Sequence, residues 1–254
     1  MLYVLSPDRL YPVFKSPKIH EKNTSSDNVG FLTLRLRLPC PIAVVPVGKG
    51  GVACVGSDIF GFLDGTLRRS CRQQGNDDLQ RENFDGHHRS HGLAFQSLVL
   101  PNGMIGDMWG PAPGRRHDSY LLRKSQLNTR LVALQEGKPF QGKVYGDAAY
   151  AILSHVDRGY RGANLTNAQK AYNTELSRVR ISVEWQFGKI VQLFALVDFR
   201  KNIKLLLSPI GKYYMIAALL TNAHTTCYGC GTSKYFKMPP PLPRGIFSIR
   251  GRCV

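Results

Sequence analysis

Two short apolar runs that each end at an aspartate constrain the fold most. The first, residues 58–64 (DIFGFLD), leads into the basic segment GTLRR, and the second, residues 142–150 (GKVYGDAAY), places Asp147 before small residues. An apolar run of this length is typical of a buried strand. We therefore predict that Asp64 and Asp147 both lie at strand ends.

The segment between these runs contains two further strand-like stretches, HGLAFQSLVL and MIGDMWG. Pro101, Asn102 and Gly103 join them, and an Asn-Gly pair favours a tight hairpin. Together with the strand that ends at Asp64, the two stretches predict a three-stranded meander.

Three segments have the composition or periodicity of helices. Residues 119–134 contain neither Pro nor Gly and predict a helix with Asp118 at its N-terminus. A last, largely apolar helix is predicted for about residues 203–222. The clearest helix, residues 166 to about 194, has an apolar stripe at steps of three and four formed by Leu176, Val179, Val183, Phe187, Ile190 and Phe194.

The same long helix carries a second, polar stripe. It consists of Asn173, Ser177, Arg180 and Glu184, at offsets of four, seven and eleven, which share one face. From that face Glu184 can meet the strand-end acids at the edge of the sheet. Hard cations such as Mg²⁺ take oxygen ligands, and a pair of them clamps the attacking and leaving oxygens of a phosphodiester.

Each of these acids also has a purely structural interpretation. Asp64 can begin an Asp-Gly turn, and Asp118 can cap the helix that follows it. Asp147 can be another turn residue, and Glu184 can form an i, i+4 ion pair with Arg180. Spacing alone leaves both interpretations open.

The charge balance indicates a polyanionic partner. The chain has 34 Lys and Arg against 17 Asp and Glu, a formal net charge of +17, which makes nucleic acid the leading partner class. Charge alone fits a ribosomal protein or a membrane-surface binder equally well.

The remaining composition predicts an intracellular protein without a membrane span. The N-terminus, MLYVLSPDRLYPVF, lacks a basic start and a cleavage site, and residues 203–220 are interrupted by two lysines and a proline. The six cysteines form no regular framework, which favours a reducing compartment. Cys227 and Cys230, with His224 upstream, fall short of the four ligands of a zinc site.

Five ordered blocks resemble the DDE superfamily endonucleases of the PIF/Harbinger transposase group, which includes the Harbinger transposase-derived nucleases. The blocks span roughly residues 60–236 and read FGFLDGT, FDGHHRSHGLAFQSLVLPNGMI, GPAPGRRHDS, YGDAAY and YNTELSRVRISVEWQFGKI. The resemblance implies an α/β, RNase H-like fold, in which a mixed sheet of an antiparallel meander plus parallel strands is flanked by helices. It also implies that Asp64, Asp147 and Glu184 are catalytic metal ligands, with Asp118 as a further metal ligand.

The activity that the resemblance implies is phosphodiester hydrolysis in DNA by two Mg²⁺ or Mn²⁺ ions, and strand transfer would use the same centre. The arginines that flank the acids are then predicted to contact DNA phosphates, although ordinary surface charge is the alternative. These arginines are Arg68, Arg69, Arg115, Arg116, Arg178 and Arg180.

The ends of the chain depart from the family pattern. We predict a poorly defined segment at 1–55, a nuclease domain at 56–236 and a Pro-rich tail at 237–254. No helix-turn-helix or other DNA-reading module is recognisable, so a separate protein is expected to read the target. A eukaryotic source would place the protein in the nucleus. An inactive, domesticated DNA-binding protein and a decayed transposon product remain the alternatives.

Overall fold

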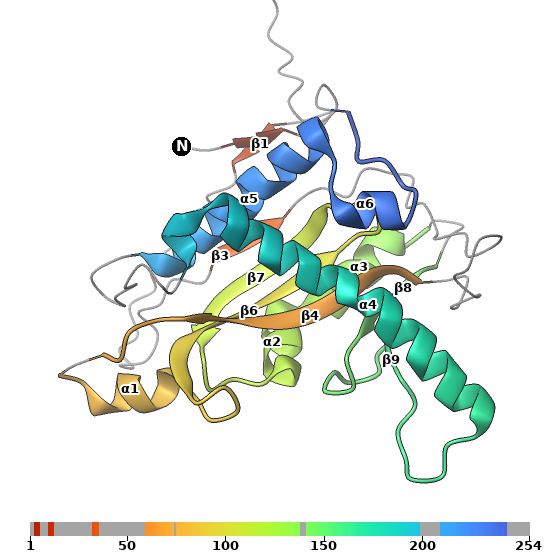
Figure 1. Ribbon diagram of the computed structural model, residues 1–254, viewed down its shortest axis with the longest axis horizontal. Helices are drawn as coiled ribbons and strands as arrows, with labels where there is room; N and C mark the ends of the chain where they lie inside the picture. The colour runs from red at the N-terminus through yellow and green to blue at the C-terminus, as the bar shows by residue number, and fades with distance from the viewer. Residues whose placement is uncertain are drawn as a thin grey trace, which may run out of the picture.

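The computed structural model describes residues 59–73, 75–137, 141–198 and 209–242, together with the backbone of three short N-terminal strands (Figure 1). The strands are β1 (Tyr3–Leu5), β2 (Leu10–Pro12), β3 (Leu32–Arg35), β4 (Ile59–Arg69), β5 (Phe84–Asp85), β6 (Ser90–Val99), β7 (Ile105–Pro113), β8 (Lys143–Gly146) and β9 (Val156–Arg158). The helices are α1 (Asp77–Asn83), α2 (Asp118–Ser125), α3 (Leu127–Gln135), α4 (Asn167–Leu193), the 3₁₀ turn η1 (Ala195–Val197), α5 (Ile210–Tyr228) and α6 (Gly231–Tyr235).

A mixed sheet in the order β3-β7-β6-β4-β8-β9 forms the centre of the described structure, and β5 extends it by pairing with β6. β4, β6 and β7 form the predicted antiparallel meander, whereas β8 and β9 run parallel to β4. The α/β fold with antiparallel and parallel strands is therefore confirmed, and it is consistent with an RNase H-like arrangement. β1 and β2 form a separate pair.

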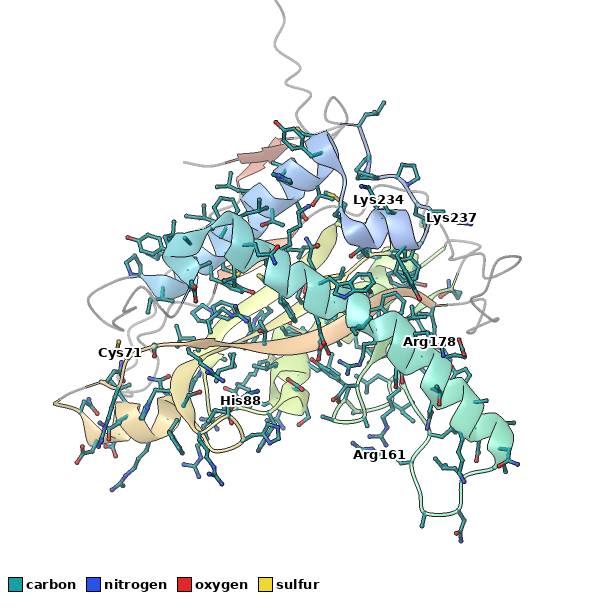
Figure 2. The ribbon with its side chains drawn as sticks, viewed as in Figure 1. Cys71, His88, Arg161, Arg178, Lys234 and Lys237 are labelled. Carbon is teal, nitrogen blue, oxygen red and sulfur yellow. The ribbon has the colours of Figure 1, made fainter. Side chains whose placement is uncertain are left out.

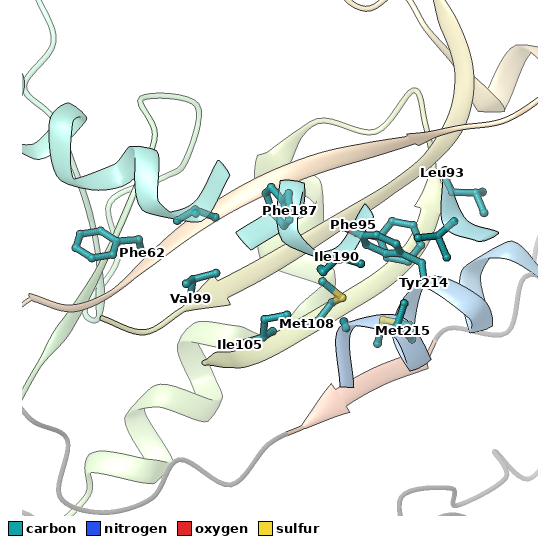
Figure 3. Packing of buried hydrophobic residues seen from close by; sticks show 14 of the residues in the cluster. Phe62, Leu93, Phe95, Val99, Ile105, Met108, Phe187, Ile190, Tyr214 and Met215 are labelled. Atoms are coloured by element: carbon teal, nitrogen blue, oxygen red, sulfur yellow. The ribbon is translucent and has the colours of Figure 1, made fainter. Parts of the chain in front are cut away.

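Helices cover both faces of the sheet. α4 and α5 pack on one face, over a cluster that includes Phe62, Phe95 and Met108 (Figures 1 and 3). α2 and α3 pack on the other face, over a cluster that includes Leu63. The side chains of neighbouring β4 residues thus pack in different clusters, because side chains alternate between the two faces of a strand.

The predicted hairpin between β6 and β7 is present. Gly103 has a positive φ of 81°, and its N–H donates to the carbonyl of Leu100 at 2.8 Å. The Asn102 side chain accepts from the N–H of Met104 at 3.1 Å. This turn sets the register in which β6 and β7 begin to pair.

The prediction of one helix over residues 119–134 is wrong, because the chain forms two helices there. Gln126 has a left-handed backbone, with φ at 53°, and separates α2 from α3. The buried Ser125 hydroxyl bridges the break by donating to the Leu122 carbonyl at 3.0 Å and accepting from the Leu127 N–H at 3.3 Å. The break lets both helices turn their leucines toward the sheet.

The last predicted helix is shifted along the chain. Residues 201–208 lie outside the described residues, and α5 continues to Tyr228 rather than ending near residue 222. Two threonines near the predicted end lie within the helix: Thr221 and Thr225 each donate to the carbonyl four residues before them, at 2.8 Å. No described helix is both long and apolar enough to cross a bilayer.

The predicted long helix and its apolar stripe are confirmed. α4 begins after Thr166, which forms a capping box with Gln169, and its stripe from Leu176 to Ile190 is buried. The terminal segments 1–55 and 237–254 fall mostly outside the described residues, so their boundaries stay predictions.

Asn222 is expected to be a large contributor to stability. Its buried side-chain amide accepts from the N–H of Ile105 at 2.8 Å and donates to the carbonyl of the same residue at 2.9 Å, which ties α5 to β7. Asn222→Leu leaves both backbone groups without a partner and should lower the free energy of unfolding by about 2–5 kcal/mol. Urea denaturation measures this loss. Leu220→Ala, at an exposed position on the same helix, is the control, and an equal loss in both variants would contradict the assignment.

Candidate active site

The pairing of two parallel strands places Asp64 beside Asp147. In the register of β4 and β8, Leu63 lies opposite Gly146, and Asp64 and Asp147 are the residues that directly follow this pair. Parallel neighbours in a sheet are about 4.8 Å apart. Asp147 follows the end of β8, and its carboxylate accepts from the N–H of Ala149. The two aspartates are therefore neighbours, and Asp147 lies at a strand end as predicted. The predicted strand end at Asp64 is wrong, because β4 continues to Arg69 through its pairing with β6.

Asp118 reaches this pair because the residue after Asp64 is a glycine. A Cβ built on Gly65 would lie 3.0 Å from Cγ of Asp118 and closer still to its Oδ1. Asp118 belongs to the first turn of α2, and His117 precedes it as an N-cap without a side-chain hydrogen bond. The absence of a side chain at residue 65 lets the third carboxylate approach β4.

The three aspartates interact electrostatically. Burial raises the pKa of Asp64 to about 6, against a partial lowering by Arg180 and a further increase from Asp118 and Asp147. Burial also raises the pKa of Asp118 to about 6, and the charge of Asp147 adds to that effect. Both shifts have the same origin, because a buried carboxylate near other carboxylates is costly to ionise.

A buried tyrosine lies close to the same carboxylates. Tyr150 has 0% exposure, and its hydroxyl has no hydrogen-bond partner among the described residues. Burial raises the pKa of Tyr150 well above 10, and the charges of Asp118, Asp64 and Asp147 raise it further. Tyr150 belongs to the GDAAY segment, whose pattern predicted a role for Asp147 alone.

Glu184 meets the aspartates through an arginine. Arg180 Nη1 lies 2.8 Å from Asp64 Oδ2, and Arg180 Nη2 lies 4.0 Å from Glu184 Oε1. The guanidinium of Arg180 therefore lies between the two acids. The Glu184 side chain is 57% exposed, so the structure brings three aspartates close together and leaves Glu184 at the edge of the group.

A cleft of about 770 Å³ opens over this group. Its walls include Asp64, Asp118 and Glu184 and also the basic residues Arg68, Arg69 and Arg116. The acids thus share one cavity with three of the six arginines that the sequence singled out.

The other three predicted phosphate contacts have different surroundings. Arg180 is engaged with Asp64, and Arg178 forms an ion pair with Glu175 at 3.1 Å. Neither of them, nor the exposed Arg115, lines the cleft. Within the cleft, the Arg68 guanidinium lies 5.0 Å from the centre of the Tyr214 ring, which fixes its direction.

The cleft also contains a pair of one histidine and one aspartate that was not predicted from the sequence. His88 lies in the turn between β5 and β6 (Figure 2). His88 Nδ1 is 2.6 Å from Asp85 Oδ2, and both residues line the cleft. Their three-residue spacing was the available signal.

Within the described ranges, no group of three or more His, Cys, Asp or Glu side chains is arranged to hold a metal ion. The donor chemistry nevertheless fits a hard divalent cation. Carboxylate oxygens are the ligands that Mg²⁺ and Mn²⁺ prefer, and burial has already raised the pKa of Asp64 and Asp118 to about 6. A cation that joined them would relieve their mutual repulsion.

The fold and the site together define an α/β protein with carboxylates clustered beside its central strand β4 and arginines around them. A family model described as DDE superfamily endonuclease matches residues 63–222, more than half of the chain. The chain therefore belongs to the DDE superfamily endonucleases, as the sequence blocks predicted. No curated protein and no solved structure matches it.

Family membership indicates a transposase-like nuclease with DNA as its substrate. The family match identifies neither the subgroup nor the roles of single residues. The PIF/Harbinger subgroup and the individual roles of Asp64, Asp118, Asp147 and Glu184 stay predictions.

The raised pKa of Asp118 predicts a pH-dependent effect on stability. Between about pH 4 and pH 6 the folded chain holds a proton that the unfolded chain has lost, so the free energy of unfolding falls as pH rises through this window. Asp118→Asn removes this penalty. In EDTA at pH 7.5 it should stabilise the chain by about 1–3 kcal/mol, and at pH 4.0 most of the gain should disappear.

Urea denaturation at the two pH values measures the effect. Asp77→Asn is the matched control, because Asp77 also lies in the first turn of a helix but is exposed. A gain at Asp118 that is equal at both pH values would contradict the electrostatic explanation.

Proposed function

We propose that the chain is a divalent-metal-dependent DNA endonuclease of the PIF/Harbinger transposase type. The convergence of Asp64, Asp118 and Asp147 carries this proposal, together with the arginines that line the cleft beside Asp64 and Asp118. The match to the DDE superfamily endonucleases supports the reaction class and the DNA substrate. The proposed reaction is hydrolysis of a phosphodiester bond.

Asp64, Asp118, Asp147 and Glu184 are the residues that would hold the cation. Bound Mg²⁺ or Mn²⁺ supplies charge stabilisation on the phosphoryl oxygens and a water of lowered pKa. Arg180 opposes the increase in the pKa of Asp64 and so favours the ionised carboxylate that a cation requires. Because this arginine contacts Asp64 directly at 2.8 Å, metal binding at Asp64 is coupled to its position.

The arginines of the cleft orient the DNA. Arg68 is fixed by the Tyr214 ring and donates to the Thr66 hydroxyl at 2.6 Å, and Arg116 lies 4.8 Å from the centre of the Tyr120 ring. Guanidinium groups held in this way bind phosphate oxygens with little loss of side-chain entropy. They also offset the repulsion between the phosphate backbone and the acids. We further propose a separate protein partner for target recognition and, for a eukaryotic source, a nuclear location.

Metal-dependent nicking of supercoiled plasmid tests the proposal. The wild-type chain should nick the plasmid with Mg²⁺ or Mn²⁺ and not with EDTA. Asp147→Asn should lower the rate at least 100-fold, because it removes a charged ligand, while the affinity for DNA is kept. Filter binding at the same salt concentration provides the second readout.

The alternative proteins give different results in this assay. An inactive DNA-binding protein would bind the plasmid and leave it intact with either metal. Equal nicking by the wild type and by Asp147→Asn would contradict the catalytic assignment. A cooperative thermal transition that Mn²⁺ shifts upward would argue against a decayed product that does not fold.

Gly65→Ala tests the approach of the third carboxylate without removing any acid. The added methyl group needs the space that the Asp118 carboxylate occupies, so Asp118 must turn away from Asp64. We expect a loss of nicking of at least tenfold with a thermal midpoint close to that of the wild type, because only the end of a side chain is displaced. Gly86→Ala is the control, since a Cβ at residue 86 meets no atom within 4 Å. Unchanged nicking in Gly65→Ala would exclude a role for Asp118.

A further inference from the structure

An exposed tryptophan follows the candidate catalytic glutamate. Trp185 is 41% exposed on α4, and Ile181, one turn earlier, is exposed to the same extent. The other tryptophan of the chain, Trp109, is buried at 6% exposure. A large aromatic side chain contributes most to stability when it is buried. An exposed one beside a candidate active site therefore indicates a contact surface.

The ring of Trp185 is held by a chain of aromatic contacts. Tyr235 of α6 packs against it edge to face, with ring centres 5.5 Å apart and planes at 88°. Such a contact occupies at most one face of the indole. Tyr235 in turn contacts Phe236, with ring centres 5.0 Å apart, and Phe236 stacks on Phe62 at 5.7 Å.

These contacts connect the exposed ring to both elements of the acidic centre. Phe62 lies on β4 two residues before Asp64, and Trp185 lies on α4 one residue after Glu184. Successive helix residues point about 100° apart, so Glu184 faces the cleft while Trp185 faces the side toward α6. The aromatic surface is therefore fixed in position next to the cleft rather than inside it.

Positive charges surround this aromatic surface. Lys234 and Lys237 are exposed at the end of α6, and Arg178 lies on α4 (Figure 2). Arg178 is two turns of helix before Trp185 and shares its side of α4, as does Ile181. Its pairing with Glu175 leaves its side chain 58% exposed. Aromatic rings among cations are complementary to a strand that has both bases and phosphates.

We propose that Trp185 and Tyr235, with Arg178, Lys234 and Lys237, bind unpaired bases of a single DNA strand beside the cleft. The proposal rests on DNA being the substrate, and it adds a preference for single-stranded DNA. Stacking on an aromatic ring is available to an unpaired base of any sequence, whereas the bases of an intact duplex are already stacked on one another. The surface would hold a strand that is unpaired next to the cleavage position.

Fluorescence provides a direct test, because only one of the two tryptophans is exposed. In EDTA, a twelve-residue oligothymidylate should quench the emission of Trp185 in a saturable way. Trp185→Phe should abolish the quenching and keep the affinity, measured by anisotropy of a labelled oligonucleotide, since phenylalanine still stacks. Trp185→Leu should weaken binding of the same oligonucleotide by about fivefold or more.

The controls separate stacking from charge and from misfolding. Tyr228→Leu removes another exposed aromatic, at 77% exposure, and should not change the affinity. An abasic oligonucleotide of equal length should bind Trp185→Leu and the wild type equally. Affinity for a blunt duplex and the thermal midpoint should also be unchanged in Trp185→Leu.

Two outcomes would overturn the proposal. An affinity of Trp185→Leu for oligothymidylate equal to that of the wild type would show that phosphates alone, or a protein partner, use this surface. Stacking would likewise be excluded if the wild type bound the abasic oligonucleotide with the same affinity as oligothymidylate. Neither readout depends on cleavage, so a chain that binds single strands and fails to nick plasmid would retain this inference and lose the proposed catalytic function.

Discussion

The parallel register between β4 and β8 is the constraint on which the rest of the site depends. It aligns Leu63 with Gly146 and thereby makes Asp64 and Asp147 neighbours, although they are far apart in sequence. Parallel strands need a long connection, and here the connection contains the rest of the meander and the helices α1, α2 and α3. Of these helices, α2 begins with Asp118 against Gly65. One strand pairing therefore brings together three carboxylates from separate segments.

This convergence is unfavourable for the folded chain taken alone. The pKa of Asp64 and that of Asp118 are both about 6, chiefly because of burial, which means that each ionised carboxylate destabilises the fold near neutral pH. Arg180 offsets part of the cost through its contact with Asp64. A chain that needed only stability would place apolar or neutral residues there, and buried groups of like charge are typical of functional sites.

Some of this arrangement follows from local sequence and some does not. The strand end at Asp147 was predictable because the aspartate interrupts an apolar run, and α4 was predictable because its apolar stripe keeps a helical period. The same pattern at Asp64 did not mark a strand end, because the basic segment after it pairs with β6. The break at Gln126 was not predictable, since the segment lacks the Gly or Pro that usually marks a helix break. The space at Gly65 and the burial of Tyr150 depend on contacts between distant segments, which no local pattern contains.

The distribution of charge links the acidic centre to its proposed substrate. A net charge of +17 attracts DNA over a distance, whereas the carboxylates act only at short range. A phosphate that enters the cleft meets Arg68, Arg69 and Arg116 together with Asp64, Asp118 and Glu184. Since Arg180 is already engaged with Asp64, the cleft arginines must offset both the acids and the incoming phosphate. A divalent cation bound by the acids would remove this competition, and its binding and that of DNA should therefore reinforce each other.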